Sequence, residues 1–152
     1  MSGVAGAECT CTPMNVRRYN ERLSGPVLDR IDIHHRMLPS TRVLSQTTAG
    51  EASSVVAARV LEARDRQRRR LTGTAWSTNG EVPGFHLRGL PSPVSMTLVD
   101  DAVRSGRLSA RGIDKVVRIS WTLADLQGRD RPSRIDLAAA LGLRQDSWRS
   151  AA

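Results

Sequence analysis

The chain is poor in several residue types, and each shortage narrows what it can be. Of its 152 residues only 3% are aromatic, so a core must be built from Val, Leu, Ile and Ala. Such a core favours helices packed through aliphatic stripes. No run of about 18 apolar residues occurs, so we expect no membrane span. The first residues, MSGVAGAE, lack the basic and apolar blocks of a secretory signal.

A second shortage concerns lysine and the phosphate-binding loop. The single lysine, Lys115, lies in Asp-Lys-Val-Val, and no G-x-x-x-x-G-K sequence followed by Ser or Thr occurs. A nucleotide cradle needs the backbone N–H groups of that glycine-rich turn and a lysine that reaches the outer phosphates. We therefore expect that this chain alone neither binds ATP tightly nor hydrolyses it, which leaves its status as an enzyme uncertain.

Cysteine is also scarce. Cys9 and Cys11 form a C-x-C pair, a spacing at which a mutual disulfide is strained. Half of a metal site is an alternative, but structural sites take about four ligands and there is no second pair. We expect free thiols, no bound metal and a reducing, cytoplasmic setting.

Basic residues are abundant instead. The chain has 23 basic and 15 acidic residues and a net charge of +8, almost all of the positive charge from arginine. Such a field attracts phosphates, although a coding bias toward arginine gives the same composition. In the run RDRQRRR, four side chains are candidate nucleic-acid contacts, while a solvated helix face is the alternative. The four candidates are Arg66, Arg68, Arg69 and Arg70.

The first quarter of the chain predicts a helix, a short turn and a strand. Thr12-Pro13 is typical of a helix start, and that helix runs to about residue 23. Ser24-Gly25-Pro26 interrupts it before a helical turn over residues 27–30. Residues 31–37 alternate as in a strand, but one strand needs a ladder partner that this chain does not provide.

The rest of the chain predicts about four helices, so the fold class is mostly α. They span residues 51–70, 93–105, 110–126 (capped by Ser109 and ended at Gly128) and a last segment opened by Ser133. Residues 71–92 are expected to be loop. Residues 97–101, TLVDD, superficially resemble an acidic Walker B strand end, but their helical periodicity predicts a surface pair. The residues expected on apolar stripes are Val56, Val60, Ala63, Gln67, Val94, Leu98, Val103, Ile113, Val116, Val117, Ser120, Leu123, Ala124, Ile135, Leu137, Ala138 and Leu141.

Two long motifs resemble one family. RRYNERLSGPVLDRIDIH, residues 17–34, resembles the segment before the last core strand of the magnesium-chelatase-related AAA+ ATPases of the YifB and ComM type. LSARGIDKVVRISWTLADLQGRD, residues 108–130, resembles their C-terminal helical domain, and EAR-x-x-Q-x-x-R at residues 62–70 fits the spacer. The resemblance covers about residues 10–144. It implies a C-terminal fragment of an AAA+ module, with the last core strand followed by a helical lid.

This resemblance also implies a division of the chain. A flexible leader would occupy residues 1–11, the end of the P-loop core 12–38, a linker 39–50, the lid 51–144 and a tail 145–152. The Walker A, Walker B and first sensor segments of the family have no counterpart here. ATP and Mg²⁺ would therefore be held only in a full assembly, by ring subunits that carry those motifs.

Two arginines take roles from the resemblance. Arg30, in Leu28-Asp29-Arg30-Ile31-Asp32, matches the family's arginine finger, which acts on a neighbouring subunit's nucleotide; the alternative is that Arg30 pairs with Asp29 or Asp32. Arg111 matches the sensor-2 arginine, the alternative being an ordinary first-turn residue. The resemblance also implies a role in DNA remodelling, since ComM-type members of the family remodel DNA. From another class, a stand-alone basic helical module that binds nucleic acid remains open, as does a remnant that folds poorly because its sheet is incomplete.

Overall fold

The computed structural model describes residues 11–22, 24–35, 50–90 and 96–145. Within these residues the structure contains seven helices and no strand, which confirms the mostly α class. Three segments discussed above lie outside the described part. They are residues 1–10 (with Cys9), most of the expected linker and the tail 146–152. No described helix is long and apolar enough to cross a membrane. The helices are α1 Pro13–Glu21, α2 Gly25–Arg30, α3 Ser53–Leu71, α4 Gly84–Gly89, α5 Thr97–Arg104, α6 Ala110–Leu126 and α7 Arg134–Gln145.

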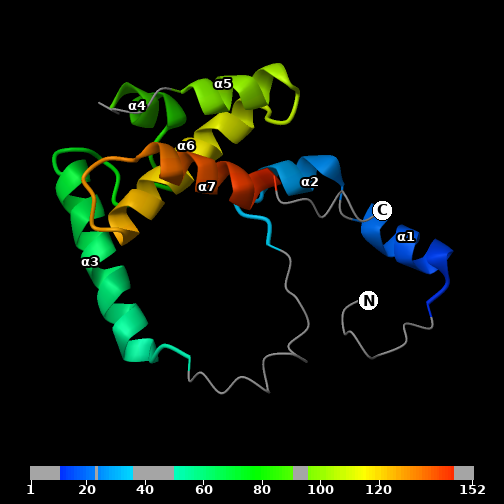
Figure 1. The fold of residues 1–152 in the computed structure, drawn as a ribbon, viewed down its shortest axis with the longest axis horizontal. Helices are drawn as coiled ribbons and strands as arrows, with labels where there is room; N and C mark the ends of the chain where they lie inside the picture. Colours follow the sequence, from blue (N-terminus) through cyan, green and yellow to red (C-terminus); the bar gives the residue numbers. More distant parts are fainter. Residues whose placement is uncertain (1–10, 23, 36–49, 91–95, 146–152) are drawn as a thin grey trace.

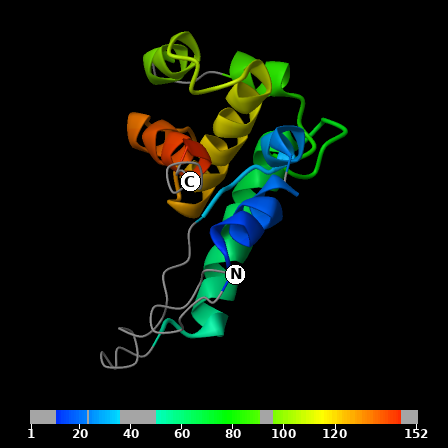
Figure 2. The same ribbon diagram turned by 90° about the vertical axis from the view of Figure 1, so that its right-hand side faces the viewer.

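Helix α6 is the centre of the fold. It packs against α3, α4 and α7, and α5 covers α7, so that α6 lies between α3 and α7 (Figures 1 and 2). Its start is fixed by Ser109, whose hydroxyl accepts a hydrogen bond from the Gly112 amide at 3.1 Å. Gly128 follows its end with φ +73°, a conformation that favours glycine. The sequence predicted both bounds correctly.

Two apolar clusters each contain residues of α6. One joins α5, α6 and α7, and the other joins the end of α3, the loop after it, α4 and α6. Burial of these aliphatic side chains is the main stabilising contribution to the fold. The first contains Val99, Ala102, Leu108, Val116, Ile119, Leu137, Ala140 and Leu141, and the second contains Leu71, Val82, Leu87, Val117 and Trp121.

Helix α4 was not expected, because residues 71–92 were predicted to be loop. It is only six residues long and begins and ends with glycine, so it is too short to show a helical period. Leu87 anchors it, with 1% of its surface exposed. The prediction of about four helices after the linker was therefore one too few, since α3 to α7 make five.

The predicted strand over residues 31–37 is also wrong within the described residues. Residues 31–35 form no ladder, and the side chains of Ile31 and Ile33 are 41% and 48% exposed. The backbone N–H of His34 donates instead to the carbonyl of Leu143 at 2.8 Å. Because an isolated strand has no partner for its polar groups, this segment lies extended against the end of α7.

Helix faces were predicted less well than helices. On α5 the buried residues are Val99 and Ala102, whereas the expected Val103 is 38% exposed. On α7 Ile135 is 75% exposed and Ala138 is exposed, and Ala140 is buried instead. The expected stripe of α3 is buried only from Ala63 onward. Val94 lies outside the described residues, while the α6 stripe is buried or half-buried as predicted.

Replacement of Leu137 by alanine tests the α6–α7 core. Leu137 is 2% exposed, so Leu137→Ala should lower the free energy of unfolding by about 2–5 kcal/mol. Ile135→Ala, on the exposed face of the same helix, should change it by less than about 0.5 kcal/mol. Urea denaturation followed by far-ultraviolet circular dichroism measures both. Equal effects of the two substitutions would contradict this packing.

Candidate phosphate-binding site

The turn that follows α2 is held by cations from the helical domain. From the end of α7, Arg144 Nη2 donates to the Asp29 backbone oxygen at 3.0 Å and to Asp29 Oδ1 at 2.7 Å, and Nη1 donates to the Ile31 carbonyl. Only 7% of the Arg144 side chain is exposed. The carbonyls at the end of a helix have no partner inside it, so one guanidinium satisfies two of them.

The single lysine completes this grip. Lys115, from α6, directs its ammonium group to the Arg30 carbonyl and to the Asp32 carboxylate, and its side chain is 7% exposed. The Ser109 hydroxyl, which caps α6, also donates to Asp29 Oδ1 at 3.1 Å. The ends of α6 and α7 therefore fix the backbone of residues 29–32.

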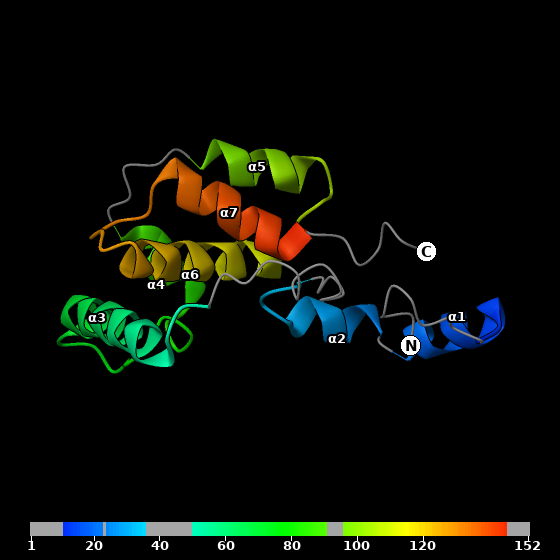
Figure 3. The same cartoon turned by 60° about the horizontal axis from the view of Figure 1, so that its bottom comes forward.

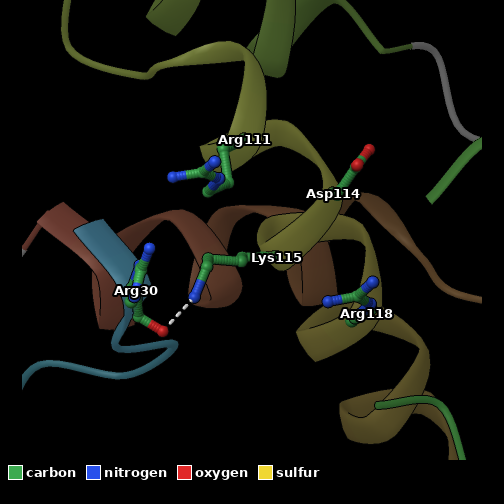
Figure 4. A pocket seen from close by; sticks show the side chains of 5 residues that line it. All are labelled: Arg30, Arg111, Asp114, Lys115 and Arg118. Atoms are coloured by element: carbon green, nitrogen blue, oxygen red, sulfur yellow. Dashed lines mark hydrogen bonds between the residues drawn. The ribbon is translucent and has the colours of Figure 1, made fainter. Parts of the chain in front are cut away.

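Arg30 is left free by these contacts. Both carboxylates that flank it are bound to other cations, Asp29 to Arg144 and Asp32 to Lys115. Among the described residues, the Arg30 side chain forms no ion pair with Asp29 or Asp32, the two acids with which it could have paired. Its guanidinium lies on the same side of α6 as that of Arg111, while the Lys115 ammonium meets the Arg30 carbonyl (Figure 4).

These side chains border a hollow of about 350 Å³. Three arginines and one lysine face it with a single acid, Asp114, and that acid is paired with Arg88 of α4. The surplus of fixed positive charge suits an anion with several oxygens, because guanidinium groups bind such oxygens through charge-assisted hydrogen bonds. The lining residues are Arg30, Arg111, Asp114, Lys115 and Arg118.

Arg111 and Arg118 occupy this hollow differently. Arg111 lies in the first turn of α6 with 63% of its side chain exposed, and its Nη1 is 3.7 Å from Asp29 Oδ2. An exposed pair at that distance is worth at most about 1 kcal/mol, so Arg111 can turn to a ligand at little cost. Arg118 donates from Nε and Nη2 to the Val82 carbonyl at 3.2 and 3.1 Å, which ties α6 to the loop before α4.

A second polar centre lies toward the other end of α6. Arg70 forms two hydrogen bonds to the Asp125 carboxylate, at 2.6 and 2.7 Å, and a third to Asn79 at 2.9 Å. Its guanidinium carbon is 4.5 Å from the centre of the Trp121 ring. Asp125 thus anchors an arginine and a loop residue, and 3% of its side chain is exposed.

This centre changes the set of candidate nucleic-acid contacts. With 13% of its side chain exposed, Arg70 is committed to Asp125 and is not available to a phosphate backbone. Arg68 is exposed but pairs with Asp65 at 2.6 Å, and Arg66 is 3.9 Å from Glu62. Arg69 is exposed and has no acidic partner among the described residues.

Sequence reasoning missed Lys115 and Arg144. Lys115 carried one signal, since it is the only lysine in an arginine-rich chain, but its neighbours in the sequence do not show that it meets Asp32. Arg144 carried none, because its acceptors lie more than a hundred residues away. In the described residues no group of His, Cys, Asp or Glu could hold a metal ion, and the described cysteine, Cys11, is free.

The bundle of helices α3 to α7 lies within the part of the chain that matches the helical lid domain of AAA+ proteins. The family model for the C-terminal part of the magnesium chelatase subunit ChlI matches residues 50–144, and the model for the ChlI subunit itself matches residues 2–45. The chain belongs to this magnesium chelatase family.

Relatives extend well beyond this chain. It is 39% identical to an uncharacterized protein of Mycobacterium bovis, 36% to the uncharacterized protein YifB of Escherichia coli and 32% to the competence protein ComM of Haemophilus influenzae. The matches cover 93%, 88% and 91% of this chain, but 29%, 26% and 27% of those proteins. The chain thus spans less than a third of the length of these curated relatives.

Removal of the Asp125 carboxylate tests the second polar centre. Asp125→Ala leaves Arg70 nearly buried without its counter-ion, which should lower the free energy of unfolding by about 3–5 kcal/mol. Asp130→Ala, an exposed acid just past the same helix, should change it by less than about 0.5 kcal/mol. Thermal and urea unfolding of both variants provide the comparison. An Asp125→Ala protein as stable as the unmodified chain would show that the pair is not structural.

Proposed function

We propose that this chain supplies two arginines to an ATP site between subunits of a magnesium-chelatase-like AAA+ ring. Arg30 is the arginine finger and Arg111 the sensor-2 residue of this site. Residues 12–38 act as the end of the P-loop core, and residues 51–144 as the lid. ATP and Mg²⁺ are held by a neighbouring subunit that carries the Walker motifs.

The observation that carries this proposal is the pairing of Asp29 and Asp32. Each is bound to a cation of the lid, Asp29 to Arg144 and Asp32 to Lys115. Either acid, if it were left without a partner, could attract the Arg30 guanidinium. Because both are already satisfied, the Arg30 guanidinium keeps its charge and its donors for another group.

A phosphoryl group undergoing transfer is a suitable ligand for the Arg30 guanidinium. Charge develops on the transferring phosphoryl oxygens, and a planar, permanently charged guanidinium stabilises it. Arg30 and Arg111 border one hollow, so we propose that both face the same triphosphate. Lys115 does not serve as a phosphate-loop lysine, because its ammonium is bound to the Arg30 carbonyl and Asp32. The nucleotide therefore belongs to the neighbouring subunit.

A second candidate function is binding of nucleic acid through the end of α3. Its supporting observation is the exposed position of Arg69, which has no acidic partner among the described residues, next to Arg66 and Arg68. The Haemophilus influenzae relative is named a competence protein. Within the proposed ring, this surface is a candidate for contact with the DNA that is remodelled.

Replacement of Arg30 by alanine tests the ring function. In a chimera, this chain replaces the portion of the Mycobacterium bovis relative that it matches. Arg30→Ala should lower its kcat for ATP hydrolysis by about 10³–10⁵-fold. The Kd for ATP should stay nearly constant, because a finger acts on charge that develops in the transition state.

The control for this experiment is Arg104→Ala in α5. Arg104 is 77% exposed, and within the described part of the chain its one acidic partner is Asp101, one turn earlier in the same helix, so its loss should leave kcat unchanged. Gel filtration verifies that each chimera assembles alike. An unmodified chimera without ATPase activity, or an Arg30→Ala chimera of full activity, would contradict the proposed function.

Salt titration of DNA binding tests the second candidate. If α3 contacts a duplex, Arg69→Ala should reduce the slope of log K against log salt concentration by about 1, whereas Arg30→Ala should leave it unchanged. Fluorescence anisotropy with a labelled duplex measures both. An affinity that does not vary with salt rules out a phosphate contact of this kind.

A further inference from the structure

We infer that Arg144 and Lys115 are positioning residues that make the arginine finger part of the lid, so that lid and finger move as one body. The inference rests on the proposed function, because it concerns how Arg30 is aimed. Neither side chain contacts the phosphate. Both act through the backbone that carries Arg30.

Three consecutive carbonyls support this inference. The backbone oxygens of Asp29, Arg30 and Ile31 each accept from a lid cation, the outer two from Arg144 and the middle one from Lys115. These are carbonyls at the C-terminal end of α2, which lack partners within the helix and favour positive charge. The lid therefore binds the backbone carbonyl of Arg30 and those of the residues immediately before and after it.

The two cations come from elements that are rigidly joined. Lys115 lies on α6 and Arg144 near the end of α7, and these helices share the largest apolar cluster. Figure 3 shows α2 lying beside the ends of both helices and away from α3. Both side chains are 7% exposed, so each is confined to its place.

Asp29 connects the finger to the proposed sensor. Its carboxylate accepts from Arg144 and from the Ser109 hydroxyl, and its other oxygen lies 3.7 Å from Arg111. A change in what Arg111 binds therefore alters the charge around the residue next to Arg30. Loss of the terminal phosphate would be transmitted to the finger through this carboxylate and the shared helices.

Arginine is needed at position 144 for a geometric reason. Its two terminal nitrogens reach three acceptors, the Asp29 and Ile31 carbonyls and the Asp29 carboxylate. A planar fork serves them together, whereas a lysine offers one compact charge on a flexible stem. Arg144→Lys should therefore keep the pair with Asp29 but hold the finger turn less firmly.

Hydrogen exchange of the full 152-residue chain tests the grip without any nucleotide. Arg144→Gln should speed exchange of the Ile31 and His34 amides by about 10–100-fold, since loss of hydrogen bonds from a charged group lets the turn open locally. Amides in the middle of α6 should keep their rates. Arg134→Gln, which removes an exposed charge at the start of α7, is the matched control and should leave both sets unchanged.

Two results of this experiment would overturn the inference. One is an Arg144→Gln chain in which the Ile31 and His34 amides exchange as in the unmodified chain. The other is faster exchange throughout α6 and α7 in both Arg144→Gln and the milder Arg144→Lys, which would assign Arg144 to general stability. A local increase in Arg144→Lys alone, smaller than about 10-fold, would support the inference if Arg144→Gln unfolds.

Kinetics in the chimera then test whether Arg144 acts through Arg30. Arg144→Gln should lower kcat by about 10-fold or more with an unchanged Kd for ATP, and the double variant Arg30→Ala/Arg144→Gln should be no slower than Arg30→Ala. Additive losses would show that Arg144 acts by another route. If Arg144→Gln is fully active while Arg30→Ala is inactive, the positioning role is refuted and the proposed function stands. If Arg30→Ala is active, the proposed function is refuted, and the hydrogen-exchange result is unaffected.

Discussion

Burial of α6 on several sides is the constraint on which the other features depend. This 17-residue helix has nine buried residues, and α3, α4 and α7 each pack on a different part of it. Because its axis is fixed by apolar contacts, the polar groups at its two ends are fixed too. Near one end, Arg111 and Lys115 line the hollow and Ser109 donates to Asp29; toward the other end, Asp125 binds Arg70. Two polar centres of different purpose are thus held by one helix.

The seven-residue run from Arg64 to Arg70 shows how position separates identical side chains. Its five arginines are chemically identical, yet Arg70 lies one turn beyond the buried Gln67 and forms an ion pair with Asp125. Arg68 and Arg69 face solvent. The number of arginines in this run is therefore an upper limit on the number that can contact a phosphate backbone. Arginines that pair with acids inside the fold, such as Arg70, must be subtracted from it.

Apolar periodicity and capping residues predicted most of the helices. They could not predict the site, because its contacts join residues that are distant in the sequence. The α6 bounds followed from its apolar period, Ser109 and Gly128. The α4 helix was too short for such a period, and the buried faces of α5 and α7 depended on the direction from which neighbours approach. Arg30 and Arg111 were indicated by resemblance. Their surroundings were not, because the contacts of Arg144 with Asp29 and of Lys115 with Asp32 cross 115 and 83 residues of sequence.

The unequal packing of α3 sets the order in which the chain unravels. Only Ala63, Gln67 and Leu71 of this helix are buried, while its first ten residues gain little from neighbours and are tied mainly by the Arg59–Glu51 pair at 2.9 Å. A helical segment of that length is marginal in water. On heating, α3 should begin to unfold at Ser53, and this local unfolding should stop near Ala63. The first turns of α3 are therefore lost before the helical bundle unfolds.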